Sequence, residues 1–166
     1  VKTAKPIIAA INGVSIGEGL TRTLACDVRV ASESARLSFR FLRVGVTPEV
    51  ASTHYAVYLI GLGRTLELML TGEIVMAPEA YRIGLVNHVY PDDELLDKAV
   101  ELAANIADNP AWNIGQVKRL VHQDYLEHDI DKVLADESEI FRMSQGRDAH
   151  REALDAFREN RRPKFH

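Results

Sequence analysis

A glycine-punctuated turn near the start of the chain has the composition of a site that holds negative charge. The apolar run Ile7–Ile11 is bounded by Pro6 and Gly13, as expected for a short buried strand. Gly17 and Gly19 follow, directly before a segment with helical character. The first amides of a helix have no partner within the helix and lie at the positive end of its dipole. Such a turn can therefore hold an anion or an oxyanion.

Two nucleotide-binding motifs compete for these glycines, and both fit badly. The dinucleotide fingerprint requires G-x-G-x-x-G, whereas Gly13, Gly17 and Gly19 are spaced G-x-x-x-G-x-G. The P-loop requires a lysine after its last glycine, and Leu20 stands in that place. The glycines alone are equally consistent with close packing of a strand against a helix.

Composition excludes several classes of partner. The 166 residues are 46% hydrophobic and 27% charged, which suits one globular domain with a substantial core. The net charge of −4 argues against nucleic acid and anionic membranes as partners. Cys26 is the only cysteine and the histidines show no ligand spacing, so no disulfide within the chain and no metal site are expected. No run approaches the roughly 20 apolar residues of a membrane span, and a cytoplasmic location is expected.

Strand-like runs are confined to the first 90 residues, which indicates an α/β or α+β arrangement in this part. These runs are Ile7–Ile11, Val28–Ala31, Arg36–Phe39 and Leu85–Tyr90. Helices are expected at 17–25, from Pro48 through Leu59, at 64–70, and from Pro78 to near Gly84.

From Pro91 onward, apolar residues recur at helical spacing. The first such stripe is Leu95, Ala99, Leu102 and Ile106. The sequence therefore predicts a first region at 1–90 and a helical region at 91–166, whose stripes are expected to pack against another subunit. The acidic run from Asp129 to Glu139 is expected to be a solvated face.

Several segments, in order along the chain, resemble the enoyl-CoA hydratase/isomerase (crotonase) superfamily. They are K-P-I-I-A-A-I-N-G, G-x-G-L, A-C-D-V-R-V-A-S-E-S-A-R, L-T-G-E, A-P-E-A-Y-R-I-G-L-V-N-H-V and A-F-R-E-N-R-R-P-K-F. The similarity extends from Lys5 to Phe165. It implies an α/β fold with a ββα spiral core, C-terminal helices that build homotrimers or hexamers, and an acyl-CoA thioester as substrate. Coenzyme A is then part of the substrate, and no separate cofactor is expected.

The resemblance also implies where an enolate is held. Family members usually carry further residues before the strand at Ile7, which supply more of the sheet and one of two oxyanion-hole amides. The N-terminal part of the core is therefore expected to precede this chain. The second amide falls on Glu18, between Gly17 and Gly19, and the Glu18 carboxylate is expected to point away from the enolate because it would oppose that charge.

The two carboxylates of the hydratases are absent. Thr21 stands where the family has its first catalytic glutamate, and Phe41 stands where it has the second. Hydration uses two acids to manage a water and a proton, so ordinary hydration is not expected here.

Another acid remains in the segment Gly45–Thr53. Pro48 and Glu49 match the place at which double-bond-shifting members carry their single proton-shuttling acid. The resemblance therefore favours an isomerase with Glu49 as base and with Gly17, Gly19, Thr21, Phe41 and Pro48 lining the substrate. Glu49 is otherwise a first-turn helix acid stabilised by the dipole. Other thioester chemistry, or acyl-CoA binding without turnover, are the alternatives.

The tail carries the last implied contact. Phe157 matches a phenylalanine that, in relatives, lies beside the adenine of CoA bound to a neighbouring subunit. The lysine expected three residues later is replaced by Asn160, and Arg161 and Arg162 could supply charge for the phosphates. A core position in the last helix is an equally good interpretation of Phe157.

Overall fold

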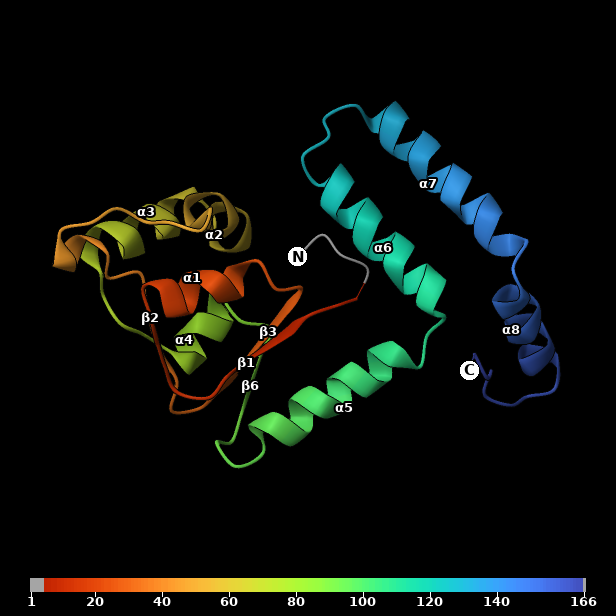
Figure 1. Ribbon diagram of the computed structural model, residues 1–166, viewed down its shortest axis with the longest axis horizontal. Helices are drawn as coiled ribbons and strands as arrows, with labels where there is room; N and C mark the ends of the chain where they lie inside the picture. The colour runs from red at the N-terminus through yellow and green to blue at the C-terminus, as the bar shows by residue number, and fades with distance from the viewer. Residues whose placement is uncertain (1–4, 166) are drawn as a thin grey trace. The chain divides into compact units, whose positions relative to one another are not determined.

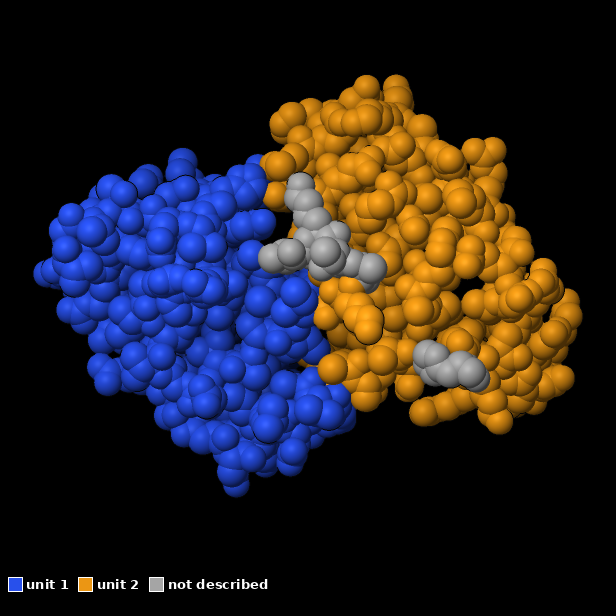
Figure 2. Space-filling view, viewed as in Figure 1, with its two compact units in different colours: residues 1, 7–101 blue, residues 2–6, 102–166 orange. Residues whose placement is uncertain are grey.

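A computed structural model describes residues 5–165, which form two compact units (Figure 2). Of the described residues, unit 1 comprises 7–101, and unit 2 comprises 5–6 and 102–165. The functional division that the sequence predicts between residues 90 and 91 remains a prediction.

Unit 1 is built on two small sheets (Figure 1). The first holds three parallel strands in the order β1 (Ile8–Ile11), β3 (Val28–Ser32) and β6 (His88–Tyr90). The second has the order β2 (Val14–Ile16), β4 (Arg36–Ser38) and β5 (Val75–Met76), in which β2 and β4 are parallel and β5 is antiparallel.

The chain alternates between these sheets. β1 is followed by β2 and then by helix α1 (Glu18–Leu24), and β3 is followed by β4, the short 3-10 turn η1 (Leu42–Val44) and helices α2 (Ser52–Ile60) and α3 (Leu62–Thr71). The crossover through α1 places β3 parallel to β1 and β4 parallel to β2, whereas the longer connection through α2 and α3 brings β5 antiparallel to β4. The third turn runs from β5 through α4 (Ala77–Arg82) to β6. This is the repeated ββα spiral that the sequence predicts.

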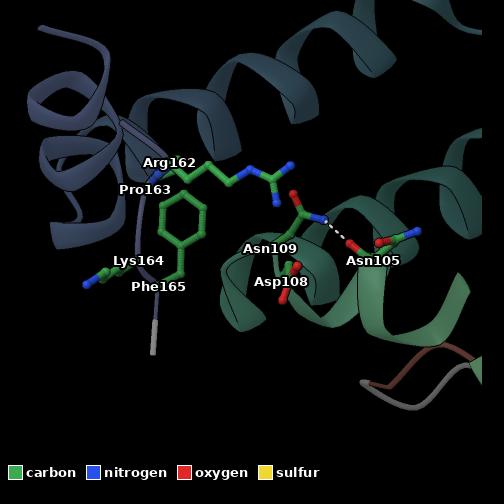
Figure 3. A pocket seen from close by; sticks show the side chains of 7 residues that line it. All are labelled: Asn105, Asp108, Asn109, Arg162, Pro163, Lys164 and Phe165. Atoms are coloured by element: carbon green, nitrogen blue, oxygen red, sulfur yellow. Dashed lines mark hydrogen bonds between the residues drawn. The ribbon is translucent and has the colours of Figure 1, made fainter. Parts of the chain in front are cut away.

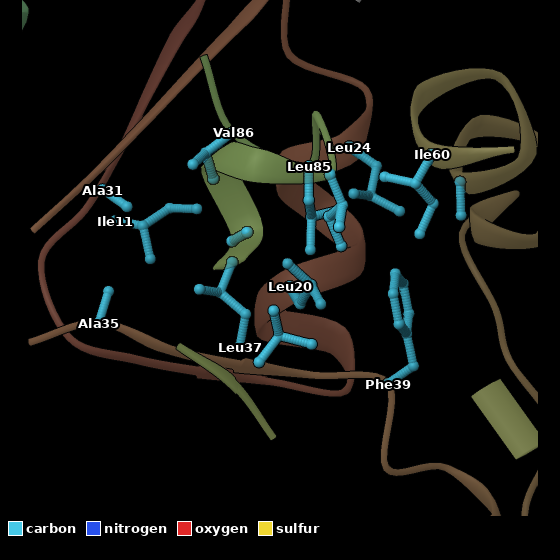
Figure 4. Close-up of a cluster of buried hydrophobic side chains, with 14 of the residues drawn as sticks. Ile11, Leu20, Leu24, Ala31, Ala35, Leu37, Phe39, Ile60, Leu85 and Val86 are labelled. Atoms are coloured by element: carbon cyan, nitrogen blue, oxygen red, sulfur yellow. The ribbon is translucent and has the colours of Figure 1, made fainter. Parts of the chain in front are cut away.

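The core of unit 1 lies between α1 and the strands (Figure 4). Leu20, Thr21 and Leu24 form the buried face of α1, and the i, i+4 spacing of the two leucines places them on one side of the helix. Leu37 and Phe39 oppose them from β4 and the segment after it. The close-up shows these side chains gathered around α1, so the helix that begins at the glycine turn is anchored by burial.

Two strands differ from the sequence prediction. β2 lies within the segment for which the sequence predicts a turn, and β5 lies outside every run for which it predicts a strand. β2 buries the polar Ser15 and exposes Val14 and Ile16, which is the reverse of the usual alternation. Hydropathy therefore gives no strand signal there.

Helices make up the rest of the chain, as predicted. α5 (Leu95–Ala107) buries Leu95 and Ala99 of its apolar stripe. α6 (Ala111–Asp124), α7 (Ile130–Gln145) and α8 (Asp148–Arg158) follow in unit 2. None of the described helices is long and apolar enough to cross a membrane.

Unit 2 is held by local polar contacts. Asp129 caps α7 by accepting from the amides of Asp131 and Lys132, at 3.1 and 3.2 Å. The guanidinium of Arg147 lies 4.3 Å from the ring centroid of Trp112, a cation–π distance. Many large apolar side chains of α6–α8 are exposed: Val117, Val121, Ile130, Leu134, Phe141, Met143, Leu154 and Phe157. The apolar stripes that the sequence shows are thus left partly uncovered within this chain.

Substitution of two glycines, one closely packed and one open, tests the packing of unit 1. Gly84 follows α4 with φ of +85°, and a Cβ there would lie 3.1 Å from the carbonyl oxygen of Leu59. Gly84→Ala is expected to lower the free energy of unfolding by about 1–3 kcal/mol, because of both strain and that contact. Gly63 in α3 has no atom within 4 Å of such a Cβ, so Gly63→Ala is expected to leave stability equal or raise it by up to about 1 kcal/mol. Urea unfolding measures both, and equal midpoints would contradict the packing described.

Candidate active site

The N-terminus of α1 presents a backbone donor. Gly17 has φ of +57°, a conformation that glycine adopts readily, and its amide donates to the carbonyl of Ser38 at 2.9 Å. The amides of Leu20 and Thr21 donate to the carbonyl of Gly17. Within residues 5–165, the Glu18 amide has no protein acceptor. This geometry gives the sequence-predicted oxyanion position a donor that a ligand can use.

The hydratase positions lie beside this donor but carry no acid. Phe41 is buried, and a Cβ built on Gly17 would lie 3.9 Å from the Phe41 ring, so the ring and the glycine turn are neighbours. Thr21 is also buried, and its hydroxyl donates back to the carbonyl of Glu18 at 3.3 Å. The structure therefore brings Gly17, Phe41 and Thr21 together, and the Thr21 hydroxyl is used within α1.

The side chain of Glu18 is neutralised by an arginine one turn later. Glu18 Oε1 accepts from Nε of Arg22 at 2.7 Å and also from its Nη2, on the exposed face of α1. The hydrogen bond and charge of Glu18, and more weakly the charge of Glu49, raise the pKa of Arg22 above its ordinary value. Sequence reasoning missed Arg22, although the i, i+4 spacing from Glu18 is the signal that marks it.

Pro48 and Glu49 precede α2 and do not form its first turn. The predicted helix start at Pro48 is wrong, since α2 begins at Ser52, whose amide donates to the carbonyl of Glu49 at 2.9 Å. The reason is a pair of left-handed residues, Val50 with φ of 53° and Ala51 with φ of 54°. The interpretation of Glu49 as a first-turn helix acid therefore fails. Pro48 is half-buried and the Glu49 side chain is exposed.

The left-handed pair stores strain next to the candidate base. Outside glycine and asparagine this conformation is uncommon, and for a β-branched residue such as Val50 it is an outlier. Each strained residue costs of order 1–3 kcal/mol, and such residues cluster at functional sites. The turn therefore marks the Glu49 segment as one whose shape is maintained at the expense of stability.

The tail residues lie in unit 2. Phe157 on α8 is 85% exposed, so it is not a core residue of this chain. Arg161 binds Glu152 and Glu159, and its hydrogen bonds to Glu152, together with one from the Lys164 amide, hold the pKa of Glu152 down at about 2. The charge of Arg161 is therefore already paired with acidic residues of the same segment.

Arg162, unlike Arg161, opens onto a hollow of about 500 Å³ in the same unit (Figure 3). Lys164 and Phe165 line it from the tail, and Asn105, Asp108 and Asn109 line it from α5 and the turn that follows. Asn109 donates to the carbonyl of Asn105 at 3.1 Å, the dashed line in Figure 3.

The remaining polar candidates form no second site. His54 packs against Tyr55 and Tyr58, with ring centroids 5.4 and 4.8 Å apart. Across residues 5–165, no three histidine, cysteine or acidic side chains are grouped so that they could hold a metal ion.

Comparison with known proteins identifies the family. The profile of the Enoyl-CoA hydratase/isomerase family matches residues 1–166. The chain is 36% identical over 158 residues to the short-chain-enoyl-CoA hydratase of Clostridium acetobutylicum, covering 95% of the chain and 60% of that protein. It is 32% identical over 165 residues to the 1,2-epoxyphenylacetyl-CoA isomerase of Escherichia coli, covering 99% of the chain and 62% of that protein.

A solved structure shares the fold. The enoyl-CoA hydratase of Bacillus anthracis superimposes with a TM-score of 0.91 at 35% identity, over 98% of this chain and 64% of that one. The chain thus spans about three fifths of the length of such relatives. Both hydratases and an isomerase are among them, so the relatives do not separate the two reactions. The ββα spiral, the free amide at the start of α1 and the matching profile together place this chain in the enoyl-CoA hydratase/isomerase family.

Proposed function

We propose that the protein carrying this chain is an enoyl-CoA isomerase, which converts a 3-enoyl-CoA to its 2-enoyl isomer with Glu49 as base. The observation that carries the proposal is the placement of Glu49. It directly precedes a strained left-handed turn, while Thr21 and Phe41 stand at the hydratase acid positions. One acid suffices for a double-bond shift, because the proton removed is the proton returned.

The proton balance is simple. The Glu49 carboxylate takes a proton from C2 of the 3-enoyl thioester, and the electron pair of that C–H bond moves into a dienolate whose negative charge rests on the thioester oxygen. The amide of Glu18 donates to that oxygen. The carboxylic acid formed on Glu49 then returns the proton to C4, which leaves the double bond between C2 and C3. In the family the other amide comes from sequence before the first strand of this chain.

The other site residues would bind rather than react. Gly17 and Gly19 let the thioester approach the backbone, and Phe41 and Pro48 supply apolar surface for the acyl chain. In the proposed assembly, a homotrimer or hexamer, Phe157 lies beside the adenine bound to a neighbouring subunit. The exposed apolar side chains on α6–α8 support such an assembly. A cytoplasmic protein with no separate cofactor completes the proposal.

Hydration is the second candidate, and the hydratase names among the relatives favour it. It would require groups other than Thr21 and Phe41 to activate water. Acyl-CoA binding without turnover is the remaining alternative, since both hydratase acids are absent.

One panel of substrates separates these functions. The full-length protein is expected to isomerise a 3-enoyl-CoA well above background and to hydrate crotonyl-CoA slowly or not at all. Product analysis by chromatography of the CoA esters gives both rates. Fast hydration without isomerisation would establish the second candidate. Tight binding of 2-enoyl, 3-enoyl and hydroxyacyl esters with no turnover would establish a binding protein.

A further inference from the structure

An acid lies directly at the candidate oxyanion donor, and this is unfavourable for an enolate. Glu18 contributes the free amide, yet its own side chain carries a negative charge on the same residue. A like charge near a developing anion raises the energy of that anion. Unless the charge of the Glu18 carboxylate is compensated, it weakens the stabilisation that the Glu18 amide can give to an enolate.

The geometry points to Arg22 as a positioning residue that cancels this charge: we propose that its guanidinium holds the Glu18 carboxylate as a neutral pair on the exposed face of α1, so that the amide can stabilise an enolate. Nε and Nη2 of Arg22 both donate to Glu18 Oε1, with Nε at 2.7 Å. The inference rests on the proposed function, because it concerns the same oxyanion donor.

The pair is well placed for an electrostatic role and poorly placed for a structural one. Both side chains are mostly solvent-exposed, and an exposed i, i+4 pair contributes little to the stability of a helix. The buried face of α1, formed by Leu20, Thr21 and Leu24, is what holds the helix in place. Loss of Arg22 should therefore leave the fold intact and leave the Glu18 charge uncompensated.

A double-mutant cycle tests the pair. Arg22→Gln in the full-length protein is expected to lower kcat for isomerisation about tenfold, the scale for an uncompensated charge roughly 10 Å from the enolate at an effective dielectric constant of about 20. The KM should change little. Arg22→Lys should retain most of the rate, and adding Glu18→Gln to Arg22→Gln should recover most of what was lost. The single Glu18→Gln variant completes the cycle.

The matched control is another exposed arginine–glutamate pair in the same unit. Arg82 binds Glu79 on α4, at 2.6 Å, and α4 packs against β4, β5 and β6. Arg82→Gln is expected to leave kcat unchanged. An unchanged rate in Arg22→Gln would overturn the inference, as would a double variant that is as slow as Arg22→Gln alone.

A second readout separates this inference from the reaction itself. Acetoacetyl-CoA ionises to an enolate when its thioester oxygen is stabilised, and the enolate is seen by its ultraviolet absorbance without any turnover. The bound enolate fraction should fall in Arg22→Gln and recover in the double variant. One outcome is that the wild-type protein shows no isomerase activity while the bound enolate fraction still falls in Arg22→Gln and recovers in the double variant. In that case the proposed reaction fails and the role of Arg22 stands. If isomerisation occurs but the bound enolate fraction is the same in the wild type, Arg22→Gln and the double variant, only the role of Arg22 fails.

Discussion

Glu49→Gln in the full-length protein is expected to lower kcat for isomerisation of a 3-enoyl-CoA at least about 10²-fold, the usual scale of acid–base catalysis. Glutamine keeps the size of the side chain but cannot accept the C2 proton. The KM should stay close to the wild-type value, because Glu49 acts in the transition state and contributes little to binding of the CoA ester. A spectrophotometric assay of the 2-enoyl product measures both constants.

The control for that variant is an acid outside the site. Glu67 lies on the exposed surface of α3, so Glu67→Gln should retain wild-type kcat. Proton exchange gives an independent check: in deuterated water the wild-type protein should exchange the C2 proton, and Glu49→Gln should not. Wild-type isomerisation in the glutamine variant would remove Glu49 from the mechanism.

Leu37→Ala is expected to lower the free energy of unfolding by about 2–5 kcal/mol. Leu37 is fully buried in the middle of β4, where it pairs with Ser15 of β2 and Val75 of β5. Removing its side chain loses the burial of that surface and leaves a cavity under α1. The midpoint of urea unfolding should fall accordingly.

Leu62 provides the same substitution on the surface. It is 62% exposed at the first residue of α3, where alanine is an equally good helix former. Leu62→Ala should therefore change stability by less than about 0.5 kcal/mol. Similar losses in the two variants would contradict the core described for unit 1.

The fold followed from the sequence wherever burial and hydropathy agree. The predicted runs correspond to β1, β3, β4 and β6, although β6 begins only at His88 and not at Leu85, and the stripe through Leu95 and Ala99 is buried as its spacing predicts. β2 was missed because its exposed residues are the apolar ones, and its pairing with β4 depends on residues some 20 positions away. β5 has only two residues and is formed by its neighbour.

For the candidate site, the sequence suggests residues but not their geometry, and the roles of those residues remain predictions. The glycine turn suggested a backbone donor, and the family motif suggested Glu49 as the acid. Local sequence preference, however, predicted a helix that begins at Pro48. Two left-handed residues, Val50 and Ala51, override that preference, and neither residue type signals such a turn. Arg22 lies on α1 among residues that the motif does not cover, and only its i, i+4 spacing from Glu18 signals their contact in the sequence.

Phe41 has a consequence for the medium in which the reaction would occur. An aromatic ring beside Gly17 replaces a polar group with one that neither orders nor activates water. Where such a ring excludes water, the local dielectric falls, and a single amide interacts more strongly with a negative oxygen than it would in bulk solvent. In the proposed reaction, a phenylalanine at this position would therefore strengthen the Glu18 donor as well as remove an acid, and both effects would favour moving a proton over adding water.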